Sequence, residues 1–183
     1  MNATLLHLSI VAGVAAWSLL FWINWNWLQQ GGHKRIFTVL AGVHLFRYIG
    51  LIALIPTMLN PVPFHFSHTY LQQVAYGDFI AMILAMIAIV AVRQNWKTAT
   101  FWAWAFFLEG TADTLNAGPN FALHITDQNL VGAMGWLILT IYVPALVVTE
   151  LLLGIHLVRQ VLRSRGDSNG VLQPINQVPN AVE

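Results

Sequence analysis

The chain has 183 residues, of which 57% are hydrophobic and only 8% charged, and its formal net charge is +1. A soluble protein carries about 25% charged residues, and a soluble fold of this length has too little interior to bury so much apolar surface. The small net charge and the absence of a basic stripe argue against a nucleic-acid partner. Because cysteine is absent, disulfides, thiolate metal sites and a cysteine nucleophile are excluded. The composition predicts an all-α polytopic integral membrane protein.

Five segments are predicted to cross the bilayer, since a helix needs about 20 mostly apolar residues to span it. Four of the segments are apolar throughout. The exception is the segment over residues 98–116, which starts apolar and ends in a polar stretch. The predicted helices cover residues 5–28, 36–59, 74–92, 98–116 and 130–158. We expect residues 1–163 to form one compact transmembrane bundle. The polar tail over residues 164–183 is predicted to be disordered and cytoplasmic.

Lysine and arginine positions predict the topology, because basic residues mark the cytoplasmic side. If five helices alternate from an outside N-terminus, every Lys and Arg except Arg47 lies in the cytoplasm. A four-helix arrangement that omits the half-polar segment would put the final arginines outside. The charge pattern therefore favours five crossings, with a cytoplasmic C-terminus, and the inner membrane if the source is bacterial.

Charged residues inside the predicted helices are informative, because each costs about 2.5–3.5 kcal/mol on insertion scales unless it is paired or hydrated. Arg47 lies twelve residues beyond Arg35, and Glu109 lies twelve residues beyond Lys97. At 1.5 Å per residue, both reach about 18 Å from the cytoplasmic edge. The matched depth predicts an ion pair of Arg47 with Glu109 or Asp113.

Two predicted helices carry polar faces that lipid cannot solvate. His44, Arg47 and Tyr48 recur at i, i+3 and i+4, and the fourth helix has two acids and an amide at i, i+4 and i+7. We expect these faces to line a wet cavity that opens outward, with an aspartate of the third helix near its mouth. The candidate ligand- or proton-binding residues are His44, Arg47, Tyr48, Asp78, Glu109, Asp113 and Asn116.

Other ionisable residues have simpler explanations. His65, His68 and His124 fall in or next to the predicted outer loops and are candidate ligands for a metal ion, although the spacing also fits ordinary loop residues. Apart from such a metal, no cofactor is predicted. Glu150 and His156 lie toward the cytoplasmic end of the last helix, where they can pair or extend to the interface.

Three functions fit these observations. The leading hypothesis is a small membrane protein that binds a small polar, ionic or amphipathic ligand or protons, with transport of that ligand left open. Arg47 would hold an anionic group, Glu109 and Asp113 would carry protons or bind a cation, and a buried histidine would relay a proton. The first alternative is a membrane-embedded enzyme acting on a lipid or isoprenoid by acid/base or metal chemistry. The second is a structural or assembly subunit of a homo-oligomer or a larger membrane complex.

Overall fold

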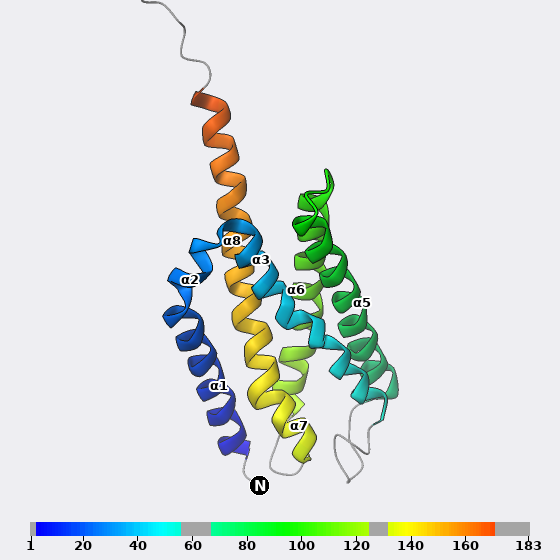
Figure 1. The fold of residues 1–183 in the computed structure, drawn as a ribbon. Coiled ribbons are helices and arrows are strands. Elements are labelled where there is room, and N and C mark those ends of the chain that lie inside the picture. Colours follow the sequence, from blue (N-terminus) through cyan, green and yellow to red (C-terminus); the bar gives the residue numbers. More distant parts are fainter. Residues whose placement is uncertain (1–2, 56–66, 125–131, 171–183) are drawn as a thin grey trace, which may run out of the picture.

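The computed structural model describes residues 3–55, 67–124 and 132–170, and the elements in these ranges are all helical (Figure 1). Two of them depart from the α-helical form: η1 is a 3₁₀ helix and η2 is a π-helical segment. The elements are α1 (Ala3–Ile23), α2 (Trp25–Gln30), α3 (Gly32–Val43), η1 (His44–Leu54), α5 (His68–Arg93), α6 (Ala99–His124), α7 (Ala133–Leu137), η2 (Ile138–Tyr142) and α8 (Val143–Gly170).

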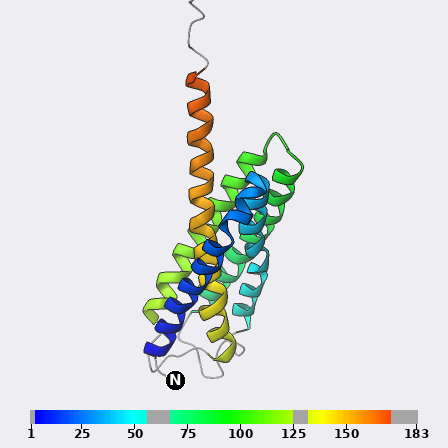
Figure 2. The ribbon, with the colours of Figure 1, turned by 60° about the vertical axis from the view of Figure 1, so that its left-hand side comes forward.

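The helices pass up and down one elongated bundle. Figures 1 and 2 show α1 rising, α3 and η1 descending, α5 rising, α6 descending beside it, and α8 rising. The start of α1 and the end of α8 therefore lie at opposite ends of the bundle. Four helical stretches are long and apolar enough to cross a membrane: Ala3–Ile23, Gly32–Leu54, His68–Arg93 and Ala133–Arg163. The predicted fold class, a helical membrane bundle, is confirmed.

The half-polar segment forms α6, a helix of 26 residues that packs alongside α5. Its length matches that of its neighbour, but the two acids at Glu109 and Asp113 lower its hydropathy below that of the other four stretches. A crossing by α6 remains a prediction, since length and direction alone do not place it in the bilayer.

Cations on α3, α5 and α8 and in the α5–α6 turn gather at one end of the bundle, which we call the basic end. The start of α3, the end of α5 and the start of α6 lie there, and α8 passes the start of α3 and projects beyond it (Figure 1). A hydrogen bond from Lys34 Nζ to the Arg93 carbonyl oxygen at 3.3 Å joins α3 to α5. His33 Nδ1 lies 2.7 Å from His156 Nε2, which joins α3 to α8. The cations are Lys34, Arg35, Arg93, Lys97, Arg159 and Arg163.

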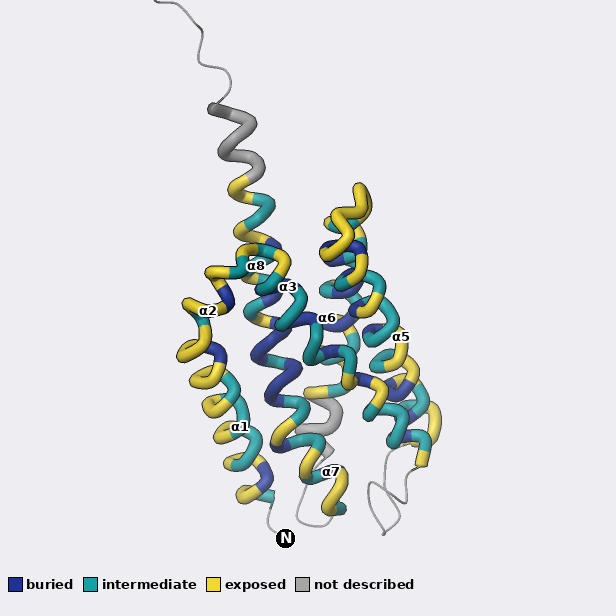
Figure 3. Tube along the Cα trace, in the orientation of Figure 1, coloured by how far each residue is buried: buried dark blue, intermediate teal, exposed yellow. Residues whose placement is uncertain are grey.

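Small side chains let the central helices approach closely. Ala81, Ala85 and Ala88 on α5 are fully buried, and α5 packs mainly against η1 and α6. Alanine at such positions is expected in membrane bundles, where close van der Waals contact drives helix association. Figure 3 shows buried residues along the bundle interior and exposed ones on its outside. The exposed faces carry large apolar side chains such as Trp22 and Leu151, which lipid would solvate.

The second crossing is not the regular α-helix predicted over residues 36–59. It is α-helical only to Val43 and continues as a 3₁₀ helix to Leu54. In a 3₁₀ helix residues i and i+3 lie in line, whereas residue i+4 turns to another side. His44 and Arg47 therefore lie in line and hydrogen-bond to each other. The tighter winding turns Tyr48, the next residue, to another side of the helix.

The first helix docks on the π-helical segment η2. A Cβ atom at Gly13 would collide with the backbone oxygen of Thr140, so only glycine permits this approach. The indole Nε1 of Trp17 donates to the Ile141 carbonyl oxygen at 2.9 Å. Pro144 follows shortly and has no N–H to donate. The indole donates to a carbonyl group of this same stretch, where the regular α-helical backbone pattern is interrupted.

The last helix is longer than predicted. It continues to Gly170, into the segment for which the sequence predicts disorder from residue 164, and the division into a bundle and a disordered tail remains a prediction. The sequence has neither proline nor glycine between Ile155 and Arg165, and nothing in it ends the helix at the membrane boundary. Residues 171–183 lie outside the described ranges.

Candidate functional site: a buried charge network

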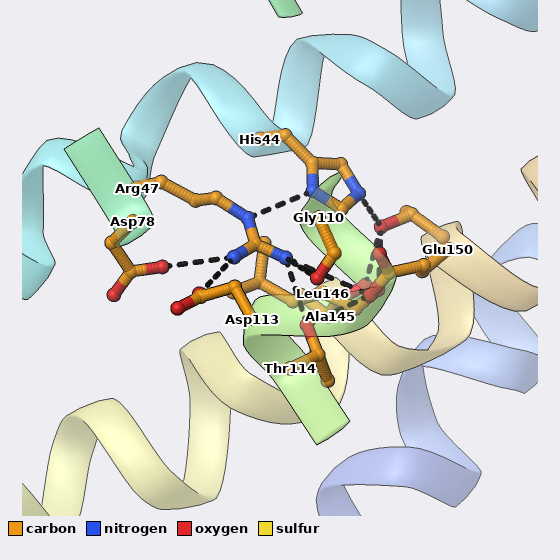
Figure 4. A network of polar contacts seen from close by, with 10 residues as sticks. His44, Arg47, Asp78, Gly110, Asp113, Thr114, Ala145, Leu146 and Glu150 are labelled. Atoms are coloured by element: carbon orange, nitrogen blue, oxygen red, sulfur yellow. Dashed lines mark hydrogen bonds and ion pairs between the residues drawn. The ribbon is translucent and has the colours of Figure 1, made fainter. Parts of the chain in front are cut away.

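Arg47 lies at the centre of a polar network where η1, α5, α6 and α8 meet (Figure 4). Its side chain is 0% exposed. Its Nη1 donates to Asp78 Oδ1 at 3.0 Å and to Asp113 Oδ2 at 2.7 Å. Its Nη2 donates to the Gly110 carbonyl oxygen at 3.2 Å and to Thr114 Oγ1 at 2.8 Å. The predicted partnership of Arg47 with an acid of α6 is therefore present, through Asp113.

The remaining N–H of Arg47, on Nε, donates to His44 Nδ1 at 3.1 Å. A guanidinium has five N–H donors, and each of them now has a partner within the chain. An anionic ligand would have to displace one of these partners. The role predicted for Arg47 as the holder of an anion remains a prediction, and this geometry disfavours it.

His44 is fixed between Arg47 and α8. Because Arg47 Nε donates to Nδ1, that nitrogen acts as an acceptor and the ring proton belongs on Nε2. Nε2 lies 3.1 Å from Thr149 Oγ1, and the Thr149 hydroxyl donates onward to the Ala145 carbonyl oxygen at 2.7 Å. The imidazole also meets the Phe106 ring edge-on, with centroids 5.1 Å apart. This chain of hydrogen bonds ends at a backbone carbonyl group within α8. Among the described residues it offers no further acceptor for a proton, so the relay role of His44 remains a prediction.

Glu150 is a member of the network that the sequence reasoning assigned elsewhere. Its Oε2 lies 3.6 Å from Arg47 Nη2 and accepts a hydrogen bond from Thr114 Oγ1 at 2.9 Å. Thr114 thus accepts from Arg47 and donates to Glu150. A signal was present, because Glu150 lies nine residues before Arg159. At 1.5 Å per residue this places it about 14 Å below the basic end.

Negative charge exceeds positive charge in the network. Asp78, Asp113 and Glu150 all lie within 4.0 Å of one guanidinium, with side chains that are 14%, 8% and 9% exposed. If all were ionised, three negative charges and one positive charge would leave −2. Glu109 adds a fourth acid nearby, and its Oε2 is buried with no hydrogen-bond partner among the described residues. The predicted Arg47–Glu109 pair is absent from the ion pairs of the described residues.

Three glycines make room for the three carboxylates. A Cβ atom added at any of them would come closer than 3.0 Å to a carboxylate oxygen of the network. The sequence shows two of these glycines next to an acid in the chain, but it does not reveal which helices face each other. The pairs are Gly50 with Asp78, Gly77 with Asp113, and Gly110 with Glu150.

Two of the predicted site residues have exposed side chains, unlike the members of this network. Tyr48 is 50% exposed, and its ring lies beside Phe46 with centroids 6.4 Å apart. The reason is the 3₁₀ winding, which turns residue i+4 away from residue i. Asn116 is exposed near the end of the α6 polar stripe. Their expected roles in ligand binding remain predictions, as does the wet cavity.

The proposed metal ligands are largely outside the described part of the chain. His68 begins α5 and its side chain is exposed. His65 falls in the range 56–66, outside the described residues, and His124 ends α6 but its side chain is not among those described. The metal prediction is untested.

The fold and the network define a polytopic helical membrane protein with a buried arginine–carboxylate cluster. The chain belongs to the family described as a domain of unknown function (DUF8737), whose model matches residues 5–158. This range includes every residue of the cluster. Comparisons with curated proteins and with solved structures find no match.

Proposed function

We propose that the protein binds protons or a small cation at the acid cluster and couples this binding to movement of protons or a small ligand across the membrane. One observation carries the proposal. Three carboxylates surround a single guanidinium whose donors are all in use. The carboxylates, with their excess negative charge, are therefore the part of the site that can bind a proton or a cation.

The energetic reason is the cost of unbalanced charge at membrane depth. Each such charge costs about 2.5–3.5 kcal/mol on insertion scales, and two carboxylates on one nitrogen repel each other unless they share a proton. Asp78 and Asp113 share Arg47 Nη1 in this way. Glu109, with a buried oxygen that lacks a partner among the described residues, is the second acid that a proton would stabilise.

The proposed topology has the basic end in the cytoplasm and the N-terminus outside, in the inner membrane if the source is bacterial. The gathering of cations at the ends of α3, α5 and α8 supports this orientation through the positive-inside rule. The proton or ligand would then enter from the opposite end of the bundle.

Infrared spectroscopy of the protein in nanodiscs tests proton binding directly. We expect the carbonyl band of protonated carboxyl groups at neutral pH, and a weaker band in Asp113→Asn. In proteoliposomes with an internal pH dye and an imposed potential, proton entry should fall at least tenfold in Asp113→Asn and Glu150→Gln, the size of effect expected when a relay acid is lost.

Asp167→Asn is the matched control, because it removes the same charge from the extension of α8 beyond Arg163. It should leave both the band and the proton flux unchanged. If the wild-type protein shows neither a protonated carboxyl group nor any flux above empty liposomes, proton binding is ruled out. A sodium or potassium titration of the same samples then tests the cation.

The complete pairing of Arg47 favours a second candidate, a structural or assembly subunit in which the network only joins four helical elements. In that case amide variants of the acids would lower the thermal stability, and the purified protein would associate with further copies or partners. If Asp113→Asn is as stable as the wild type but loses proton flux, proton binding is supported. If Asp113→Asn is less stable and the wild type shows no proton flux, the structural role is supported. For the enzymatic alternative, no specific contact in the described residues adds support.

A further inference from the structure

An open cavity of about 410 Å³ lies at the basic end, away from the Arg47 network. It sits between the first turns of α3 and the last turn of α5, which the hydrogen bond from Lys34 Nζ to the Arg93 carbonyl oxygen connects. Its lining residues are Gly31, Lys34, Arg35, Thr38, Val39 and Arg93. Its volume falls in the range of about 300–1,000 Å³ usual for small-molecule sites.

The lining is strongly cationic. Lys34, Arg35 and Arg93 contribute three positive charges, and no acid is among the lining residues. Every ion pair of the described residues involves Arg47, so within that part of the chain these three cations have no carboxylate partner. Such a cluster attracts an anion, because mutual repulsion of the cations is relieved when one binds.

The side chains of Lys34 and Arg35 are held by neighbouring elements, Lys34 through its hydrogen bond to the Arg93 carbonyl oxygen. Arg35 Nη1 donates to the Trp27 carbonyl oxygen at 3.1 Å, and the guanidinium carbon lies 5.0 Å from the centroid of the Trp27 ring. A Cβ atom at Gly31 would collide with the Arg35 side chain, so this glycine lets Arg35 fold over the α2–α3 junction. Arginine has five donors and lysine three, which leaves donors on each for an oxyanion.

Neutral groups add to the same preference. Thr38 brings a hydroxyl group to the cavity wall, and the N-terminal turn of α3 borders the cavity at Gly31. A helix N-terminus carries a partial positive charge and favours anions. At a cytoplasmic membrane surface, basic pockets between helices bind anionic lipid headgroups.

We propose that this cavity binds a phosphate oxyanion, carried by an anionic lipid headgroup or present as free phosphate. The site is independent of the acid cluster, because it shares no residue with it. The variant that tests it is the double substitution Lys34→Gln/Arg93→Gln. Its control is Lys97→Gln/Arg163→Gln, which removes the same charge from exposed residues that do not line the cavity.

Two measurements on the full-length protein distinguish the sources. Inorganic phosphate is titrated calorimetrically into protein in a neutral detergent. In parallel, native mass spectrometry measures retention of phosphatidylglycerol against phosphatidylcholine from mixed micelles. At roughly fivefold per cation near a charged surface, the test variant should bind about 25-fold more weakly than the control.

A selective loss of phosphatidylglycerol supports the site with a lipid as its ligand, and a selective loss of inorganic phosphate alone supports it with a soluble phosphate. The proposal is overturned if the wild type binds neither probe. It is also overturned if the test and control variants lose affinity to the same extent, because the effect would then come from overall charge.

Discussion

A single arginine organises the polar interior of this bundle. Arg47 donates from all its N–H groups, and its acceptors come from its own helix, from α5 and from α6, with Glu150 of α8 at ion-pair distance. Lysine carries the same charge but only three donors from a single point, and it cannot reproduce the planar fork. The network therefore depends on the shape of the guanidinium as well as on its charge.

Replacing Arg47 should be among the most damaging single changes in the chain. Arg47→Gln leaves buried carboxylates without their cation, and removing one partner of a buried pair typically costs about 3–5 kcal/mol. Arg47→Lys should lose less, because it keeps the charge. Thermal unfolding in detergent, followed by tryptophan fluorescence, measures both. Lys97→Gln, an exposed cation outside the network, should leave the unfolding temperature unchanged, and equal stability of Arg47→Gln and wild type would refute the role of the network.

The glycines of the network can be tested without touching a charge. Gly77→Ala would push its new methyl group into Asp113, and overpacking of this kind typically costs about 1–3 kcal/mol. Gly42→Ala is the control, because a Cβ atom at Gly42 meets nothing within 4 Å. In a helix it should be neutral or stabilise by about 0.5–1 kcal/mol. If both variants unfold at the same temperature, the close fit around Asp113 has no energetic importance.

Part of the site could be read from the sequence and part could not. Depth arguments place Arg47 and Glu109 at the same level, because both are counted from basic residues at the same membrane edge, and they put Asp113 one turn further along α6. They do not fix the rotation of each helix, so Glu109 was as good a candidate as Asp113. Glu150 was assigned to the interface because its nearest landmarks are the arginines of α8. Thr114 and Thr149 carry no charge, so the cost of burying charge gives no signal for them.

At the scale of the elements, two non-α segments position the network. η1 brings His44 and Arg47 into line, and η2 lies about two turns before the part of α8 that carries Thr149 and Glu150. The long apolar runs of the sequence predict where helices occur, because both the lipid and the bundle interior require apolar side chains. Local winding is decided by side-chain hydrogen bonds and by proline, so the 3₁₀ and π segments were not predictable from apolar runs.

The contact between α1 and η2 gives an element-scale prediction. Trp17→Phe keeps the aromatic surface but removes the indole N–H, so the Ile141 carbonyl oxygen loses its donor. Loss of one hydrogen bond typically costs about 0.5–1.5 kcal/mol, and the unfolding temperature should fall accordingly. Trp22→Phe is the control, because Trp22 is 75% exposed and makes no equivalent contact among the described residues. If the two variants have the same unfolding temperature, this hydrogen bond does not hold α1 in place.

At the scale of the whole molecule, the path of α6 decides the membrane topology. The two possible topologies differ in one simple respect. With five crossings, the α5–α6 turn and the end of α8 lie on the same side of the membrane. With four crossings, in which α6 stays on one side, they lie on opposite sides. The charge pattern and the up-and-down path of the helices favour the first arrangement.

Single-cysteine labelling can decide between them, because the chain has no cysteine of its own. Gln94→Cys lies in the α5–α6 turn, Leu162→Cys lies toward the end of α8, and Thr69→Cys lies at the start of α5, all at exposed positions. In intact cells, a membrane-impermeant maleimide should label Thr69→Cys alone, and after lysis it should label all three. Labelling of Leu162→Cys but not Gln94→Cys in intact cells would mean that α6 does not cross. In that case Asp113 would have to reach Arg47 from outside the bilayer, and the excess of carboxylates would be balanced by water rather than by protons held at depth.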